Sequence, residues 1–342
     1  MTDAEPILVT GAAGFIGFHV ARRLLERGRC VLGVDNLDPY YDVRLKEARL
    51  KQLAGFPTFG FERLDIADRA GMAALFSARR FPAVVHLAAQ AGVRHSLVDP
   101  HVYVDANVAG FLNVLEGCRN QRCGHLVYAS SSSVYGANTK TPFSTAQPAD
   151  HPLSLYGATK KANELMAHAY AHLFAIPATG LRFFTVYGPW GRPDMAVWRF
   201  TAAVFEGRPV ALFNHGRMRR DFTYIDDAAE AVLRILDRAP QGDPRWSGEH
   251  PDPARSRAPW RLYNIGNGRP VEVDEVLRLI EAAAGRTAVT ELMPMQPGDV
   301  AETCADVADL EREFGFRPNT PIAEGVRRFV AWYRGHREGE LH

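Results

Sequence analysis

Cysteine is scarce in this sequence, which has Cys30, Cys118, Cys123 and Cys304 among 342 residues. None of them forms a C-x-x-C pair or has histidines at zinc-finger spacing, so the pattern predicts neither a disulfide framework nor a metal site. We expect reduced thiols that pack in the core of a cytoplasmic protein.

A large net charge and a long apolar run are also missing. The 40 Lys and Arg residues against 39 Asp and Glu residues leave a formal net charge of +1, which argues against broad electrostatic capture of nucleic acid. No apolar run approaches the roughly 18 residues that cross a bilayer, and the acidic start at residues 1–5 leads straight into a predicted strand. We therefore expect no membrane anchor, and an anionic ligand would have to be held by local groups.

What the sequence does contain is an alternation of short apolar strands and amphipathic helices. Strands are predicted at residues 6–10, 30–34, 59–64, 83–87, 125–129 and 178–184. Strands that alternate with helices predict an α/β fold: a Rossmann-type, doubly wound parallel sheet that binds ligands beyond the carboxyl ends of its strands.

After residue 185 the pattern loosens into short strands, at 210–213 and 220–225, and helices, at 226–236, 273–284, 307–314 and 323–333. We predict a cofactor-binding domain over residues 1–185 and a smaller α/β substrate lobe over residues 186–342. Residues 241–259 are rich in Pro, Gly, Arg and Asp, which favours a mobile surface loop within that lobe.

A glycine-rich turn, Gly11-x-x-Gly14-x-x-Gly17, joins the first strand to the first helix. Glycines allow the backbone to approach a pyrophosphate, whose charge then lies at the positive end of the helix. The spacing differs from G-x-G-x-x-G, and a glycine turn alone can be only a tight loop. Asp35 adds weight, because a carboxylate at the end of the second strand can accept from both adenosine ribose hydroxyls and would repel a 2′-phosphate. NAD is therefore favoured over NADP.

Further residues at the strand ends complete the predicted cofactor site. Asp65, after the third strand, can be a turn cap or can bind the adenine amine, and both interpretations stay open. Small residues after the fourth strand would let a ligand lie against the backbone, whereas His86 is expected to be a packed strand histidine. The predicted cofactor-binding residues are Gly11, Gly14, Phe15, Ile16, Gly17, Asp35, Asn36, Asp65, Ile66, Leu87, Ala88, Ala89, Asn107, Tyr156 and Lys160.

Tyr156 and Lys160 stand four residues apart on a predicted helix and therefore share a face. A nearby ammonium favours the phenolate, and a cationic nicotinamide would favour it further, so Tyr156 could act as a base. Ser131, in a run of four serines after the fifth strand, could hydrogen-bond the oxygen that Tyr156 deprotonates. The run could also be a mere capping loop, and a Tyr-x-x-x-Lys pair can occur by accident.

The order of these features along one sheet resembles the extended short-chain dehydrogenase/reductase family. Longer strings are similar to those of the UDP-glucuronate 4-epimerases within it: Asp35-Asn36-Leu37, Tyr40-Tyr41-Asp42, AAQAGVR at 88–94 and RFFTVYGPWGRPDM at 182–195. The resemblance covers nearly the whole chain. It implies a non-dissociating NAD and a nucleotide-sugar substrate.

By position, the resemblance implies that Arg220 contacts the diphosphate, that Phe213 stacks near uracil and that Asp299 holds the uridine ribose. Each residue also has a simpler interpretation, as a surface ion pair, a core aromatic and a turn acid. One departure is Gln296, where related epimerases often carry Arg, and it puts a second cationic contact to the diphosphate in doubt.

The implied reaction interconverts UDP-glucuronate and UDP-galacturonate. Tyr156 removes the 4-hydroxyl proton while hydride passes from C4 to NAD, the 4-keto sugar turns about its diphosphate, and hydride returns to the other face. Lys160 assists Tyr156 and holds the nicotinamide ribose, and Ser131 orients O4. The predicted substrate-binding residues are Ser132, Ser133, Thr185, Arg192, Phe213, Arg220 and Asp299.

Arg192 and Thr185 are expected to hold the sugar carboxylate, because a bidentate guanidinium would keep the β-keto acid intermediate from losing carbon dioxide. The alternative is that Arg192 only pairs with Asp194 in a turn.

Two enzyme classes share the opening oxidation, namely nucleotide-sugar 4,6-dehydratases and UDP-glucuronate decarboxylases. They typically carry an acid where this chain has Ser133, so both are disfavoured. A protein that only senses NAD is disfavoured by the intact Tyr156 and Lys160 pair. By analogy we expect a homodimer through helices near residues 99–117 and 154–174.

Overall fold

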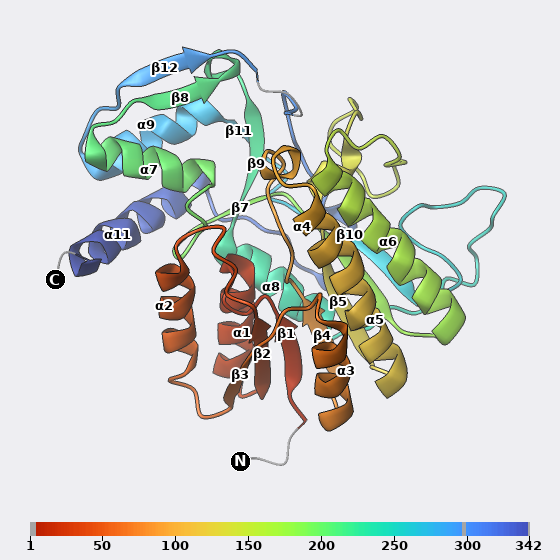
Figure 1. Ribbon diagram of the computed structural model, residues 1–342. Helices are drawn as coiled ribbons and strands as arrows, with labels where there is room; N and C mark the ends of the chain where they lie inside the picture. Colours follow the sequence, from red (N-terminus) through yellow and green to blue (C-terminus); the bar gives the residue numbers. More distant parts are fainter. Residues whose placement is uncertain (1–4, 296–298, 341–342) are drawn as a thin grey trace.

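Within residues 5–295 and 299–340, which the computed structural model describes, seven parallel strands form the main sheet in the order β10-β6-β5-β4-β1-β2-β3 (Figure 1). Chain order reverses between β1 and β4, which is the doubly wound arrangement expected. The strands are β1 (Ile7–Thr10), β2 (Val31–Asp35), β3 (Phe59–Arg63), β4 (Ala83–His86), β5 (His125–Ser131), β6 (Ala178–Phe183) and β10 (Trp260–Ile265). The predicted fold class is confirmed.

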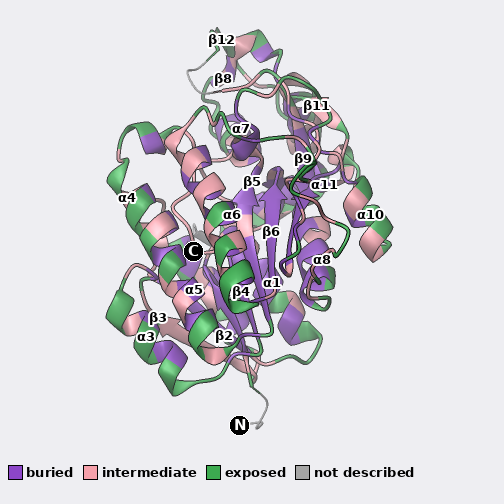
Figure 2. Cartoon of the chain, turned by 90° about the vertical axis from the view of Figure 1, so that its right-hand side faces the viewer, coloured by how far each residue is buried: buried purple, intermediate pink, exposed green. Residues whose placement is uncertain are grey.

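Helices cover both faces of this sheet. On one face α1 packs against α2 and α8, and on the other α5 packs against α3 and α6. Their bounds are α1 (Phe15–Glu26), α2 (Val43–Leu53), α3 (Arg69–Ala78), α4 (His101–Val104), α5 (Gly110–Gln121), α6 (Leu155–Phe174) and α8 (Ile225–Leu236). Figure 2 shows the buried strands enclosed between helices that are exposed on their outer sides.

The smaller lobe lies beyond the carboxyl ends of the strands, at the top of Figure 1. A three-stranded sheet has the order β11-β9-β7, and β8 pairs with β12 in parallel. These elements are β7 (Thr185–Tyr187), α7 (Ala196–Glu206), β8 (Val210–Phe213), β9 (Arg219–Tyr224), β11 (Pro270–Glu272), α9 (Val273–Ala284), β12 (Thr290–Met293), α10 (Ala308–Phe314) and α11 (Ile322–Glu340). A smaller α/β lobe was expected here.

Two details differ from the sequence prediction. Residues 260–265 were not recognised as a strand, yet β10 pairs with β6 and completes the main sheet. The chain thus returns to the main sheet after residue 185, and the boundary between the two domains stays a prediction. Ser130 and Ser131 were placed in a closing loop, but β5 continues through them because they pair with Arg182 and Phe183 of β6.

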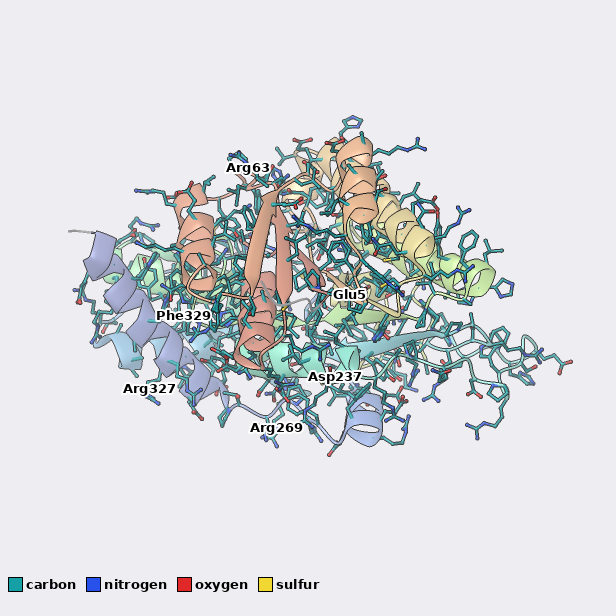
Figure 3. The ribbon with its side chains drawn as sticks, turned by 90° about the horizontal axis from the view of Figure 1, so that it is seen from below. Glu5, Arg63, Asp237, Arg269, Arg327 and Phe329 are labelled. Atoms are coloured by element: carbon teal, nitrogen blue, oxygen red, sulfur yellow. The ribbon has the colours of Figure 1, made fainter. Side chains whose placement is uncertain are left out.

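The connection between α8 and β10 contains the predicted surface loop. Residues 241–259 hold no helix or strand and project away from the sheet, as the view from below shows beyond the label of Asp237 (Figure 3). Ala254 and Ala258 are nevertheless buried. The end of the loop therefore packs against the sheet, and its mobility stays a prediction.

Candidate active site

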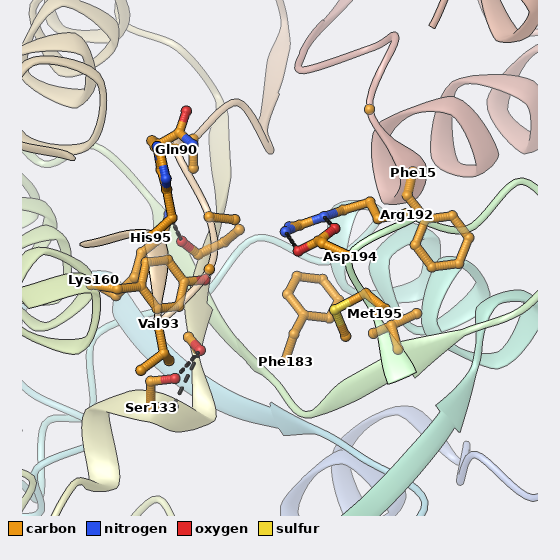
Figure 4. A pocket seen from close by; sticks show the side chains of 18 of the residues that line it. Phe15, Gln90, Val93, His95, Ser133, Lys160, Phe183, Arg192, Asp194 and Met195 are labelled. Carbon is orange, nitrogen blue, oxygen red and sulfur yellow. Dashed lines mark hydrogen bonds and ion pairs between the residues drawn. The ribbon is translucent and has the colours of Figure 1, made fainter. Parts of the chain in front are cut away.

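A cleft of about 1390 Å³ opens at the carboxyl ends of the parallel strands. Every residue that the sequence predicted for the site lines it, with the exception of Asn107. Strand ends and loops from both lobes contribute to its walls, so residues up to about 290 positions apart in the chain meet there. Figure 4 shows Arg192 and Asp194 facing each other, with Lys160 and Ser133 on the other side of the view.

The glycine turn at the start of α1 has no room for side chains. Gly11 has φ +73°, and a Cβ there would lie 2.6 Å from the backbone nitrogen of Ala88, while a Cβ on Gly17 would lie 2.0 Å from the carbonyl oxygen of Gly11. Helix α1 begins without a side-chain cap and has no acid in its first turn. Its first N–H groups and positive dipole therefore suit a diphosphate.

Asp35 presents its carboxylate at the end of β2. Its two oxygens accept from the backbone nitrogens of Ala13 (3.1 Å) and Leu37 (2.9 Å), which fixes the side chain beside the glycine turn. Asp65 accepts from the backbone nitrogen of Ala67 (2.8 Å) and from Asn36 Nδ2 (2.9 Å). Asp65 is thus a turn-forming acid that also lines the cleft, so its position is compatible with both interpretations of it.

Tyr156 and Lys160 lie in the first two turns of α6, whose N-terminus is capped by Ser154. Burial raises the pKa of Tyr156, whereas a hydrogen bond to Ser131 and the positive charge of Arg192 oppose that rise. The effect expected of Lys160 on this pKa stays a prediction. Burial lowers the pKa of Lys160 to about 8, and its Nζ donates to the carbonyl of Ala129 (3.0 Å).

The four serines at the end of β5 divide between two environments. Ser130 donates to buried Glu164 (2.7 Å), which is also held by Arg182. Ser131 lies on the cleft side and donates to Ser133 Oγ (3.2 Å). All four serines line the cleft, but the hydroxyl of Ser130 is engaged by Glu164. Ser131 also caps the turn that follows, since its Oγ accepts from the nitrogen of Ser133, so both interpretations of the run stay open.

Asn107 was predicted to contact the cofactor, and the structure shows its side chain joining two segments of the chain. It is buried outside the cleft lining, in the π-helical turn at residues 105–109. Its Nδ2 donates to the carbonyl of Gln90 (2.9 Å) and to Thr159 Oγ1 (3.1 Å), and its Oδ1 accepts from the nitrogen of Gln90 (2.8 Å). Its amide group joins the loop after β4 to α6, and its contact with the cofactor stays a prediction. His86, by contrast, is packed as expected, at 2.8 Å from Thr10 Oγ1.

Arg192 forms a bidentate pair with Asp194, through Nε at 3.0 Å and Nη2 at 2.6 Å. The simpler alternative for Arg192 is therefore present in the structure. Burial lowers the pKa of Arg192, but Asp194, together with Tyr41 and Tyr40, outweighs this effect, so the pKa is raised. Both side chains remain partly accessible in the cleft wall, together with Thr185, so another carboxylate could take the place of Asp194.

At the end of the cleft formed by the smaller lobe, Arg220 lies 3.9 Å from Asp299. Arg94, to which the sequence prediction gave no role, donates to Asp299 (3.1 Å) and lies over the ring of Phe213 at 4.4 Å. Two guanidinium groups thus face one carboxylate, which leaves a net positive pocket for an anionic ligand. The sequence signal that could have revealed Arg94 is its position, because it is a cation in the loop of small residues that follows the fourth strand. Gln296 lies outside the described residues.

The site and the fold together define an NAD-binding enzyme of the short-chain dehydrogenase/reductase type. Residues 7–247 match the family model "NAD dependent epimerase/dehydratase family", and the chain belongs to this family.

Individual relatives cover almost the full length. A protein of Escherichia coli O111:H-, named only as an uncharacterized 37.6 kDa protein, is 57% identical over 96% of this chain and 98% of its own. A probable UDP-glucuronate 4-epimerase of Rhizobium meliloti is 49% identical over 95% of this chain and 96% of its own. The solved UDP-glucuronic acid 4-epimerase of Bacillus cereus, in complex with UDP-glucuronic acid and NAD, has a TM-score of 0.86 and 31% identity, over 97% and 99% of the two chains.

Within the described residues, no helix is long and apolar enough to cross a membrane.

Proposed function

We propose that this protein is a UDP-glucuronate 4-epimerase, which interconverts UDP-glucuronate and UDP-galacturonate with tightly bound NAD. The observation that carries the proposal is the meeting of Ser131, Tyr156 and Arg192 in one cleft that also contains the glycine turn and Asp35. The names of the relatives, and the two ligands of the Bacillus cereus complex, support the same substrate.

NAD would lie along the glycine turn and Asp35, where it would accept a hydride from C4 and return it. The residues of the chain do the rest. Tyr156 takes the proton of the 4-hydroxyl group, and Ser131, which lines the same cleft, orients O4. Lys160 lies one turn beyond Tyr156 on α6, and its ammonium is held by the carbonyl of Ala129.

The uridine diphosphate would be held at the end of the cleft formed by the smaller lobe. Arg94 and Arg220 supply two positive charges for the diphosphate, and Phe213 supplies an aromatic face for the base. Binding energy concentrated in the nucleotide leaves the sugar free to turn, which an epimerase needs in order to present both faces of C4.

Hydroxyl groups, without a carboxylate, occupy residues 131–133. A dehydratase or a decarboxylase needs a further acid or base to move a second proton, so this local chemistry favours epimerisation.

The proposal includes a cytoplasmic homodimer. Several large apolar side chains are exposed along α5 and α6, namely Leu112, Leu165, Leu173 and Phe174, and they lie within the helices predicted for the interface. Light scattering of the purified protein, compared with a Leu165→Glu variant, tests the dimer.

Incubation of the purified protein with UDP-glucuronate and product analysis by NMR tests the function. UDP-galacturonate should appear until the two sugars reach equilibrium. Irreversible formation of a UDP-pentose as the main product would instead identify a decarboxylase.

A further inference from the structure

The loop that precedes Arg192 is fastened to the cofactor-binding half of the molecule through three successive carbonyl groups. His19 Nε2, from α1, lies 2.9 Å from the oxygen of Pro189. Arg49 Nη2, from α2, donates to the oxygens of Trp190 (2.7 Å) and Gly191 (3.0 Å). Since residues 189–191 lead directly into Arg192, these contacts determine where the backbone of Arg192 begins.

Arg49 also contacts the glycine turn. Its Nη1 donates to the carbonyl of Ala13 (2.8 Å) and to the hydroxyl of Tyr41 (2.7 Å). One guanidinium thus joins the turn that suits the diphosphate of NAD to the loop that carries Arg192. The fork geometry of arginine makes this possible, because a single planar group has five N–H donors.

The environment of Arg49 is unusual for a cation. The side chain is fully buried at 0% exposure, and within the described part of the chain no carboxylate forms an ion pair with it. Burial lowers the pKa of Arg49, while Tyr41 and the more distant charge of Asp35 oppose this effect. A buried charge without a counter-ion destabilises a fold. Both of its Nη groups donate to neutral oxygens, four in all. No neutral side chain has enough N–H groups to contact all four oxygens, which indicates that the guanidinium is there to join them.

The loop itself has a backbone shape that needs support. Trp190 has φ +62°, a left-handed conformation that costs a bulky residue on the order of 1–3 kcal/mol. Its ring packs against Phe18 at 5.6 Å and Trp332 at 5.3 Å. Burial lowers the pKa of His19 to about 4, so its ring is neutral at pH 7 and can donate from Nε2 to Pro189.

We propose that Arg49, assisted by His19, is a positioning residue that holds residues 189–191 against the glycine turn and thereby sets the guanidinium of Arg192 in the sugar end of the cleft. The inference rests on the proposed function and on the expectation from the sequence that Arg192 holds the sugar carboxylate. Arg49 itself touches neither substrate nor reacting atoms.

The consequence of a misplaced Arg192 is chemical. In the 4-keto intermediate, the C5–C6 bond can break, so that carbon dioxide leaves. The electron pair of the broken bond stays on the sugar as an enolate across C5 and C4. A proton then adds at C5, giving a 4-keto-pentose and leaving one reduced cofactor on the protein. The ratio of epimerised to decarboxylated product therefore reports on how well Arg192 is placed, independently of how much protein is folded.

The test compares Arg49→Lys and Arg49→Met with the wild-type holoenzyme on UDP-glucuronate, by NMR of the products and by NADH fluorescence. A lysine keeps the charge but cannot bridge the four oxygens. We expect epimerisation to slow by roughly 10- to 100-fold, since a displacement of about 1 Å can cost on the order of 10²-fold. The decarboxylated share should rise by a comparable factor, and adding Arg192→Ala should raise it no further.

A matched control is Arg261→Met, which removes another buried guanidinium, one that pairs with Asp309 and Glu313 away from the cleft. An unchanged product ratio in the Arg49 variants, equal to that of Arg261→Met, would refute the positioning role. His19→Ala removes one of the three fastenings and should give a smaller shift, so it serves if Arg49→Met does not fold.

Hydrogen exchange supplies a readout that does not depend on activity. Amides in peptides covering residues 188–196 should exchange faster in Arg49→Lys than in the wild type or Arg261→Met, while the remaining peptides should match. If the wild type fails to convert UDP-glucuronate, the proposed function is wrong, yet the exchange comparison still decides whether Arg49 fastens the loop. Unaltered exchange in residues 188–196 would overturn the inference.

Discussion

Replacing Arg192 by alanine removes the guanidinium that we expect to hold the sugar carboxylate, and the structure sets the size of the effect. Hydrogen bonds to a charged group contribute about 1.5–3 kcal/mol each. In the protein alone, however, Asp194 already accepts from Nε and Nη2 of Arg192, at 3.0 and 2.6 Å. A bound carboxylate would exchange places with Asp194, so the net gain is far smaller than the sum of two bonds.

Taking about 1.5 kcal/mol for this exchange, Arg192→Ala should weaken UDP-glucuronate about tenfold. Binding of UDP-glucose, which has a 6-hydroxyl group in place of the carboxylate, should change little. The same reasoning predicts the opposite result for Asp194→Asn, because removing the competing carboxylate should tighten UDP-glucuronate by up to about tenfold.

Isothermal titration of both nucleotide sugars with the wild type, Arg192→Ala and Asp194→Asn measures these differences, and NMR of the products detects any 4-keto-pentose. Equal losses for both sugars in Arg192→Ala, without additional decarboxylation, would show that Arg192 does not hold the carboxylate. Weaker binding of UDP-glucuronate to Asp194→Asn would show that Asp194 orients Arg192 and does not compete for it.

Three further outcomes are expected. NAD should copurify, because the glycine turn and Asp35 form a fitted site, and turnover that depends strictly on added cofactor, with none released on denaturation, would contradict this. Tyr156→Phe should reduce turnover by roughly 10²–10⁴-fold with little change in UDP binding, and near-normal turnover would remove Tyr156 from the mechanism. Burial lowers the pKa of Lys160 to about 8 from 10.5, so the folded protein binds this proton less tightly than the unfolded chain does. The buried ammonium therefore costs stability below about pH 8, and the cost fades as pH rises toward about 10.5. Inactive Lys160→Met should melt about 3 °C higher than cofactor-free wild type near pH 7, a gain that shrinks above about pH 8; a pH-independent difference would contradict the assignment.

Much of the fold was predictable because its signals are local. Most predicted strands of the main sheet were short apolar runs, although those at 59–64 and 178–184 contain charged residues, and the glycine turn marked where the first one ends. The strand at residues 260–265 escaped detection for a physical reason. All six residues are buried, but Arg261 and Asn264 break the apolar pattern. Arg261 donates to Glu313 and Asn264 to the carbonyl of Phe143, both far away in the chain.

The sequence by itself determined that Tyr156 and Lys160, the proposed catalytic pair, share one face of a helix, because their spacing needs no tertiary information. It also determined the cofactor turn, since glycine is the residue that its backbone requires. Only the tertiary structure decided which polar groups are already engaged. The amide of Asn107 donates to Gln90 and Thr159, and Arg94 forms an ion pair with Asp299. Arg49 donates to four oxygens that belong to three segments of the chain. Such contacts connect residues brought together by packing, so a local pattern could not reveal them.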